Sequence, residues 1–142
     1  MYSIKKFTTK EKDLAAIAFD IRNKVFVEEQ KVDREEEYDS HEDSSTHFLL
    51  LKSDQPIGTA RWRFTDNGIK LERFAVLKEH RNSGGGSFLV NEVLKDVIPH
   101  KKNIYLNAQL SAINVYARAG FVKEGEMFRE ANIDHYKMTL KK

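Results

Sequence analysis

The sequence predicts an α/β fold in which a mixed β-sheet is flanked by helices. Strand and helix patterns follow one another in the order β-α-β-β-β-α-β-α-β-β. The turn Asp66-Asn67-Gly68 joins two of these strands as an antiparallel hairpin. The next helix pattern lies between two strand patterns, which is typical of a crossover between parallel strands. Antiparallel hairpins combined with a crossover make a mixed sheet.

Residue patterns assign each element in turn. Alternating residues or short apolar runs indicate strands, and apolar residues at helical spacing indicate helices. A Thr8/Glu11 capping box starts the first helix, Pro99 closes the second and Gly120 ends the third. In chain order the patterns predict a strand over 2–7, a helix over 9–27, strands over 47–52, 57–65 and 69–76, a helix over 85–97, a strand over 104–108, a helix over 111–119 and a β-hairpin over 121–140.

Three stretches are expected to lie between these elements. Residues 28–43 are expected to form an acidic loop with room for a short helix, and residues 54–56 are typical of a turn. Asn67 and Gly68 both tolerate the positive φ that a tight hairpin turn demands.

The length and composition indicate one globular unit. The chain has 142 residues, of which 40% are hydrophobic and 32% charged, so we expect one domain over residues 1–142 and exclude disorder. The longest apolar run, Phe48–Leu51, cannot cross a bilayer, and residues 1–6 lead into no signal-peptide core. We therefore expect a cytoplasmic protein with no membrane partner. Cysteine is absent, which excludes disulfides, thiolate metal ligands and a cysteine nucleophile.

Charge is unevenly distributed along the chain. The net charge is +2, but residues 28–43 contain nine acidic and two basic side chains, so the remainder is strongly basic. An acidic block is typical of a solvated loop; alternatively it favours a cationic ligand, while the basic remainder favours a phosphate-bearing one. The basic residues are scattered without interleaved aromatics, so nucleic acid is not an expected partner.

A glycine-rich segment, Arg81-Asn82-Ser83-Gly84-Gly85-Gly86-Ser87, separates a strand from a helix. Glycines leave backbone N–H groups bare and the helix N-terminus adds partial positive charge, so the segment suits a pyrophosphate. It has no lysine for a P-loop, and Leu89 stands at the third glycine position of the dinucleotide fingerprint. Taken alone, the segment is also compatible with an ordinary glycine-rich turn.

Two motifs in the correct order resemble a known family. The Arg-x-x-Gly-x-Gly pattern of residues 81–86 resembles the acyl-CoA pyrophosphate loop of the GCN5-related N-acetyltransferase (GNAT) family. Residues 112–121 reproduce that family's Ala-x-x-x-Tyr-x-x-x-Gly-Phe segment. The resemblance covers essentially the whole chain. It implies the GNAT acyl-CoA N-acyltransferase fold, in which the mixed sheet is splayed at its centre.

A closer likeness is to the ElaA-type branch of the family. Residues 22–30 look like that branch's Arg-x-x-Val-Phe-x-x-Glu-Gln stretch, and residues 106–109 also resemble it. The sequence departs from the pattern at three positions. Gln109 stands where many relatives have asparagine, Asn132 where the branch commonly has glycine, and Gly85 is an additional glycine in the loop. None of these departures removes a group that the chemistry needs.

The resemblance implies acetyl-CoA as acyl donor and co-substrate. Its pantetheine arm is expected between the strands that splay near Val76 and Asn107, with backbone groups of Phe74 and Val76 and the Asn107 side chain as partners. The amides of residues 82–87 are expected to hold the pyrophosphate. The full set implied in donor binding is Phe74, Ala75, Val76, Arg81, Asn82, Ser83, Gly84, Gly85, Gly86, Ser87, Asn107, Ala112 and Tyr116.

Direct transfer to a primary amine requires two proton transfers. A lysine-like ammonium, with a pKa of roughly 10.4, loses a proton to a base, and the departing CoA thiolate gains one from an acid. Tyr116 is the expected acid, and Glu72 is the expected base because strand alternation puts it on the same side as Phe74. His135 or a water molecule is an alternative base, since histidine changes charge near neutral pH. The structural alternatives are packing for Tyr116 and an ion pair with a neighbouring arginine for Glu72.

The acceptor pocket is expected to be lined by Glu29, Gln30, Glu130 and His135, although a histidine in the last strand is also compatible with a structural role. The acid-rich segment favours a cationic amine as acceptor. No metal site is expected, because His41, His47 and the acids near them lack tight ligand spacing.

The sequence as a whole predicts an N-acetyltransferase that transfers acetyl from acetyl-CoA to a primary amine in a ternary complex. The acceptor is a small molecule or a peptide, and the protein is a monomer or a homodimer. The alternative is a non-catalytic acyl-CoA-binding sensor or interaction module, because a fold does not guarantee its chemistry.

Overall fold

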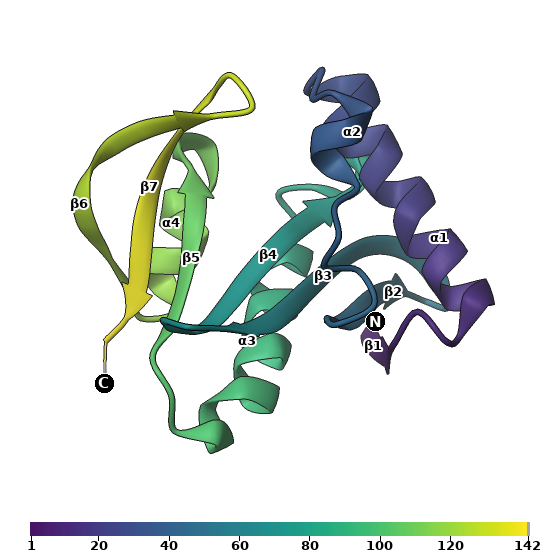
Figure 1. The fold of residues 1–142 in the computed structure, drawn as a ribbon. Coiled ribbons are helices and arrows are strands. Elements are labelled where there is room, and N and C mark those ends of the chain that lie inside the picture. The colour runs from purple at the N-terminus through teal and green to yellow at the C-terminus, as the bar shows by residue number, and fades with distance from the viewer. Residues whose placement is uncertain (142) are drawn as a thin grey trace.

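The fold is a mixed β-sheet with helices on both faces (Figure 1), seen in a computed structural model that describes residues 1–141. The strands of the sheet are ordered β1-β2-β3-β4-β5-β7-β6. The strands are β1 (Tyr2–Phe7), β2 (Thr46–Lys52), β3 (Gln55–Thr65), β4 (Gly68–Val76), β5 (Ile104–Gln109), β6 (Phe121–Glu130) and β7 (Ile133–Leu140). The helices are α1 (Lys12–Arg22), the π-helix η1 (Asn23–Glu29), α2 (Arg34–Glu37), the 3₁₀ turns η2 (Lys78–His80), η3 (Ile98–His100) and η4 (Leu110–Ala112), α3 (Gly85–Val97) and α4 (Ile113–Arg118). The predicted fold class is confirmed.

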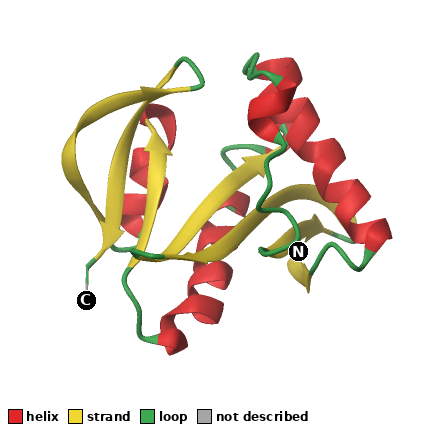
Figure 2. Cartoon of the chain, in the orientation of Figure 1, coloured by secondary structure: helices red, strands yellow, loops and turns green. Residues whose placement is uncertain are grey.

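The sheet is splayed between β4 and β5, its parallel pair. The two strands are paired at Ile69↔Ile104, Lys70↔Tyr105 and Leu71↔Leu106. Beyond Leu71 the pairing of the two strands stops, and their ribbons diverge (Figure 2). The central splay implied by the family resemblance is therefore present, and it leaves the ends of β4 and β5 without a ladder partner along their facing edges.

A β-bulge in β4 changes which side chains face which side of the sheet. The β3–β4 register shifts between Thr59 and Arg61, and Arg73 opposite this shift has a φ of 59°. An extra residue in a strand reverses the alternation beyond it. Phe74 therefore packs with Leu71 on the α3 side, whereas Glu72 pairs with Arg61 on the opposite side. The prediction that Glu72 and Phe74 share a side is wrong for this reason.

Each face of the sheet has its own hydrophobic core. On one face, α3 packs residues such as Leu89 and Val93 against the centre of the sheet. On the other face, α1 packs Ala18 and Ile21 against β2. The apolar stripe of each helix is buried against the sheet in this way. This burial stabilises the sheet whose strands β4 and β5 diverge.

The first helix differs from its prediction at both ends. Its α-helical part begins at Lys12, because Glu11 accepts a hydrogen bond from the Thr8 N–H (3.1 Å) while Thr8 Oγ1 accepts one from Lys10 rather than from Glu11. Only half of the capping box is formed. After Arg22 the helix widens into η1, a π-helix, a form often found near functional sites.

The hairpin turns are close to their predicted places. The β2–β3 turn consists of Ser53 and Asp54, both with positive φ, so it precedes the predicted stretch by one residue. At the β3–β4 hairpin Gly68 has a φ of 129°, while Asn67 has no positive φ. The short helix expected in the acidic segment is α2.

The helices within residues 1–141 do not match a membrane span. None of them is both long enough and apolar enough to cross a bilayer.

Candidate active site

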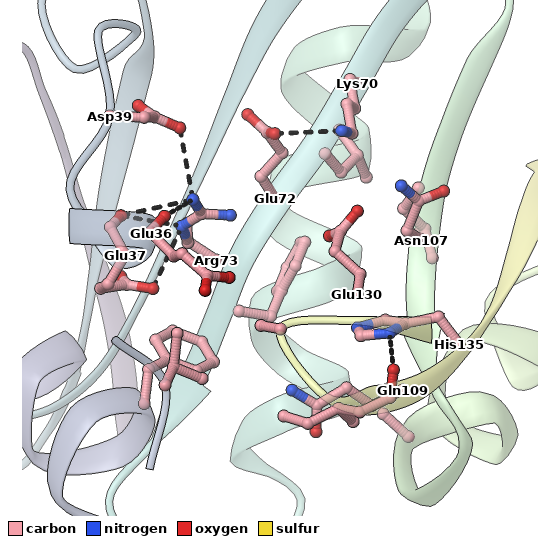
Figure 3. Close-up of a pocket in the computed structure, with 18 of the residues that line it drawn as sticks. Glu36, Glu37, Asp39, Lys70, Glu72, Arg73, Asn107, Gln109, Glu130 and His135 are labelled. Carbon is pink, nitrogen blue, oxygen red and sulfur yellow. Dashed lines mark hydrogen bonds and ion pairs between the residues drawn. The ribbon is translucent and has the colours of Figure 1, made fainter. Parts of the chain in front are cut away.

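Two cavities meet in the splay between β4 and β5. The loop cavity has a volume of about 610 Å³ and is bordered by the glycine-rich loop, α3 and α4. The hairpin cavity has a volume of about 460 Å³ and lies between α2 and the β6–β7 hairpin (Figure 3). The residues that line both cavities are Phe74, Gln109, Ala112 and Tyr116. Two molecules bound in these cavities would therefore meet at these four side chains.

The glycine-rich loop presents bare amides at the start of α3. Within residues 1–141, the N–H groups of residues 82–87 donate to no backbone or side-chain acceptor. The Tyr2 hydroxyl donates to the Ser83 carbonyl (2.7 Å), which fixes the loop to β1. Bare amides at the N-terminus of a helix form an anion site, so the loop fits a pyrophosphate.

The three loop glycines are needed for different reasons. Gly84 has a φ of 93°, which side chains rarely adopt. A Cβ at Gly85 would lie 3.3 Å from both Leu50 and Tyr2, so the additional glycine lets α3 approach the sheet. A Cβ at Gly86 would meet open space beside the bare amides. Open space there leaves room for the phosphates that the amides can hold.

Arg81 and Glu29 form a clasp beside this loop. The guanidinium of Arg81 donates to both carboxylate oxygens of Glu29 (2.6 and 2.7 Å) and to the Val76 carbonyl (2.9 Å). The hydrogen bond from Arg81 lowers the pKa of Glu29. The clasp holds η1 against the end of β4. Glu29 lines neither cavity, and its predicted place in an acceptor pocket stays a prediction.

Gln30 and Gln109 form a bridge over the mouth of the splay. The Gln109 side-chain amide, at the end of β5, donates to the Gln30 Oε1 at 2.9 Å. Gln30 lines the loop cavity and not the hairpin cavity. With the Arg81–Glu29 clasp, this bridge joins the β4 side of the splay to the β5 side through the end of η1.

Tyr116 lies at the junction of the two cavities. Its ring packs edge-on against Phe74 (5.6 Å between centroids) and Phe121 (6.1 Å), and only 8% of the residue is exposed. Its hydroxyl has no hydrogen-bond partner within residues 1–141. Burial raises the pKa of Tyr116, so the hydroxyl keeps its proton at neutral pH.

Glu72 is part of an ion-pair cluster. Its carboxylate accepts hydrogen bonds from Arg61 (3.1 Å) and Arg63 (2.8 Å) and lies 3.3 Å from Lys70. Burial raises the pKa of Glu72, but the hydrogen bond from Arg63 and the surrounding positive charges outweigh it and lower this pKa to about 2. A carboxylate with so low a pKa is a poor acceptor for the proton of an ammonium group. These contacts correspond to the alternative structural role of Glu72 and disfavour its role as base.

His135 is oriented with one ring nitrogen free. The Ile133 carbonyl lies 2.7 Å from Nδ1, and because a carbonyl only accepts, Nδ1 carries the proton and donates. In the neutral ring, Nε2 then keeps its lone pair. The ring stacks on Phe128 (5.7 Å between centroids), is 7% exposed and lines the hairpin cavity. Nε2 has no hydrogen-bond partner in the described chain.

Two further predicted residues reach the hairpin cavity. Glu130 lies at the end of β6, and Asn107 lies on the splayed part of β5 (Figure 3). The Asn107 side chain borders the hairpin cavity and not the loop cavity. Asn107 can therefore make its predicted contact with the pantetheine arm only where that arm reaches the hairpin cavity.

Much of the acid-rich segment is internal counter-charge. Arg22 pairs with Glu37 (2.6 Å) and Glu42 (2.7 Å), and Arg61 pairs with Asp39 (2.7 Å) and Glu42 (2.9 Å). Arg22 and Arg61 are 1% and 0% exposed. A buried guanidinium requires such partners. The acids at positions 37, 39 and 42 therefore serve the fold, contrary to a fully solvated loop.

Histidine, aspartate and glutamate side chains do not cluster as metal ligands in the described part of the chain. Within residues 1–141, no group of three or more of them has a geometry that could hold a metal ion.

Sequence reasoning assigned no role to three side chains that line the loop cavity, namely Gln109, Ser111 and Arg118. Gln109 was noted only as a departure from a family pattern. Ser111 directly precedes the family segment of residues 112–121 and Arg118 lies within it, and their polar character at that segment is the available signal.

Comparison with known proteins agrees with this geometry. A family profile for the acetyltransferase (GNAT) domain matches residues 8–142. An uncharacterized N-acetyltransferase of Bacillus subtilis (strain 168), YjcF, is 36% identical over 137 residues, which cover 95% of this chain and 98% of the relative.

Solved structures show the same fold. Escherichia coli ElaA superposes with a TM-score of 0.85 at 26% identity, covering 99% of this chain and 100% of ElaA. A GNAT acetyltransferase of Elizabethkingia anophelis with acetyl-CoA bound superposes with a TM-score of 0.70 at 17% identity, covering 97% of this chain and 94% of that one. The splayed sheet, the bare amides and the paired cavities are thus accounted for together: the chain belongs to the GNAT family of acyl-CoA-dependent N-acyltransferases.

Proposed function

We propose that residues 1–142 act as one N-acetyltransferase domain that transfers the acetyl group of acetyl-CoA to a primary amine by direct transfer in a ternary complex. The observation that carries the proposal is the position of Tyr116, whose unpartnered hydroxyl lies where the two cavities meet. Direct transfer needs both substrates to touch one reacting centre, and a shared wall between two cavities provides that proximity.

The loop cavity takes the acyl donor in this proposal. The amides of residues 82–87 bind the pyrophosphate, and the free edges of β4 and β5 bind the pantetheine arm. The bare amides and the open space at Gly86 support this fit. The acetyl-CoA bound by the Elizabethkingia relative supports the choice of donor.

Tyr116 protonates the sulfur of the departing CoA. A buried phenol with a raised pKa keeps its proton until a thiolate forms beside it. A thiol has a pKa of roughly 8.5 and a tyrosine one of roughly 10, and burial raises the pKa of Tyr116 further, so the transfer is uphill. The same burial disfavours the charged thiolate and raises the pKa of the departing thiol, which offsets the mismatch.

His135 accepts the proton of the acceptor amine, directly or through a water molecule. Its Nε2 is free within the described chain and borders the hairpin cavity, where the amine binds. Of the three candidates for base, His135 has the environment that supports the role, whereas Glu72 is engaged by Arg61, Arg63 and Lys70.

Replacing Tyr116 by phenylalanine tests the proposal. We expect kcat, measured as free CoA released in the presence of a panel of primary amines, to fall about 100-fold or more. The Kd for acetyl-CoA, measured by calorimetry, is expected to stay within about twofold, because the variant keeps the ring packing against Phe74. The control is Tyr105→Phe, a buried tyrosine whose hydroxyl meets Thr65 outside both cavities.

Two outcomes would contradict the proposal. An unchanged kcat for Tyr116→Phe would remove this residue from the mechanism. Tight binding of acetyl-CoA without CoA release across the amine panel would instead support a non-catalytic acyl-CoA sensor.

A further inference from the structure

The hairpin cavity is lined by more acidic than basic side chains. Each lining cation lies in an ion pair: Arg63 and Lys70 share Glu72, and Arg73 pairs with Asp39. The lining has five carboxylates against these three cations, namely Glu36, Glu37, Asp39, Glu72 and Glu130. The carboxylates of Glu36 and Glu130 also border the cavity, and within residues 1–141 neither accepts a hydrogen bond or joins an ion pair. Both are exposed, so both remain hydrated and available.

These two carboxylates come from opposite walls of the hairpin cavity. Glu36 lies on α2 and Glu130 at the end of β6, and the close-up shows both beside the central space (Figure 3). The Arg73 guanidinium donates to the backbone carbonyl of Glu36 at 3.3 Å, which fixes the α2 wall but leaves the Glu36 carboxylate unengaged. A cation in the middle of the cavity would therefore meet negative charge from either side.

Independent observations indicate that this cavity is built for a ligand. Tyr116 is 8% exposed and His135 is 7% exposed, yet within residues 1–141 the Tyr116 hydroxyl and the His135 Nε2 have no partner. Within residues 1–141 no fully buried side-chain polar atom lacks a hydrogen-bond partner, so these two atoms are the cavity-facing tips of otherwise buried side chains. They are held in place by packing and are free to bond a substrate. The two atoms lie on the inner wall, whereas Glu36 and Glu130 are exposed and stand at its rim.

We propose that the acceptor is a dicationic amine: one amino group reaches Tyr116 and His135 for acetylation, while the second, still charged, is bound by Glu130 and Glu36. The inference rests on the proposed function and names its acceptor class. An anionic acceptor, such as an amine bearing a carboxylate, is disfavoured because each lining cation already has an acidic partner and the rim would repel a further negative charge.

The experiment compares two acceptors that have the same four-carbon chain, 1,4-diaminobutane and n-butylamine, in a CoA-release assay with the full chain. Wild type is expected to show a kcat/KM about tenfold or more higher for the diamine, and added salt should reduce this ratio. Glu130→Gln is expected to lower this ratio at least about fivefold, because it removes a negative charge that faces the second amino group, which butylamine lacks. Glu36→Gln should act in the same direction.

The matched control is Glu126→Gln. Glu126 is an exposed glutamate on the same strand that lines neither cavity, so its substitution should leave the ratio unchanged. If the ratio is near one in wild type, or persists in both Glu130→Gln and Glu36→Gln, the dicationic acceptor is overturned while the N-acetyltransferase proposal stands. If neither these two amines nor any other member of the amine panel releases CoA in wild type although acetyl-CoA binds, the proposed function fails and this inference with it.

Discussion

The orientation of His135 decides which of its two nitrogens can act. Nδ1 is committed to the Ile133 carbonyl, and the ring is stacked on Phe128. Its register partner on β5 is Gln109, which borders both cavities. The imidazole is therefore held by its own turn and directs Nε2 to the cavity where the amine is expected.

Replacing His135 by glutamine tests this residue. We expect kcat to fall about 100-fold, with the Kd for acetyl-CoA unchanged, because glutamine cannot accept a proton at neutral pH. The assay is CoA release under saturating acetyl-CoA. His100→Gln, an exposed histidine outside both cavities, serves as the control. A His135→Gln enzyme with wild-type kcat would return the role of base to water or to Glu72.

At the same scale, the sequence could assign residue types but not their partners. Tyr116, Glu130 and His135 line the cavities, and their predicted roles stay predictions. Glu29 and Glu72 are as acidic in the sequence as Glu130, but the fold pairs them with Arg81 and with the Arg61–Arg63–Lys70 set. Residue spacing in the sequence does not predict which arginine of another helix or strand will lie next to a given carboxylate in the fold.

The N-terminus of α3 is the element on which donor binding depends. Its first turn offers bare amides, and its boundaries, Gly85–Val97, agree with the prediction because glycines precede a clear apolar stripe. A side chain placed at Gly86 would enter the space in front of these amides without meeting the rest of the protein.

The substitution Gly86→Glu tests this element. We expect the Kd for CoA to rise about tenfold or more, because the carboxylate occupies the phosphate position and repels the ligand. The melting temperature should not fall, since the new side chain meets open space and an acid is favourable at a helix N-terminus. Gly86 is preferable to Gly84 for this test, because the positive φ of Gly84 would add strain.

The control for this test is Asn91→Glu, at an exposed position further along the same helix, for which we expect an unchanged Kd. Equal affinity of Gly86→Glu and wild type for CoA would mean that the loop is a turn without a phosphate-binding role.

Elements with regular patterns were predictable, and irregular ones were not. The π-helical widening of η1 and the bulge at Arg73 both insert a residue into a regular pattern. A periodic pattern assumes that no residue is inserted. It therefore predicts that Glu72 and Phe74 share one side of the strand, and that the first helix runs without interruption over 9–27. Both irregularities lie at the splay. Departures from regular helix and strand geometry are expected at a functional site.

For the whole molecule, the ion-pair cluster joins elements from the first half of the chain. It links α1, α2, the segment after α2, β3 and β4 through Arg22, Arg61 and the acids that surround them. Breaking such a buried pair by removing one partner typically costs about 3–5 kcal/mol. The cluster thereby fixes α2, one wall of the hairpin cavity, to the sheet.

The cluster predicts loss of stability in acid. The pKa of Glu72 is lowered to about 2, and the pKa values of Asp39 and Glu42 are also lowered, because their arginine partners outweigh burial. Burial raises the pKa of Glu37, which acts in the opposite direction. A group with a depressed folded pKa stabilises the protein above its unfolded pKa, and this stabilisation is lost as the pH falls toward the folded value. For Glu72 alone the loss is roughly 3 kcal/mol between about pH 4.5 and pH 2.

Urea unfolding followed by circular dichroism at pH 7, 4.5 and 3 measures this effect. The free energy of unfolding should decrease steeply below pH 4.5, and Glu72→Gln should show a smaller decrease over the same range. A free energy of unfolding that is the same at pH 3 and pH 7 would show that the cluster does not contribute in this way.

The architecture as a whole was the most predictable level. The order of elements along the chain, the crossover through α3 and the final hairpin follow from patterns spread over many residues, so a local irregularity does not alter them. The charge cluster was not predictable, because it depends on side chains brought together from distant parts of the chain.

The divergence of β4 and β5 beyond Leu71 leaves this sheet one strand short. A pantetheine arm is itself a string of amides, so a ligand seated there takes the place of the absent strand, by the same backbone recognition that joins an added peptide to a sheet edge. Under the proposed function, the bound donor completes the hydrogen bonding between β4 and β5, and its release in each catalytic cycle leaves these strand edges free again.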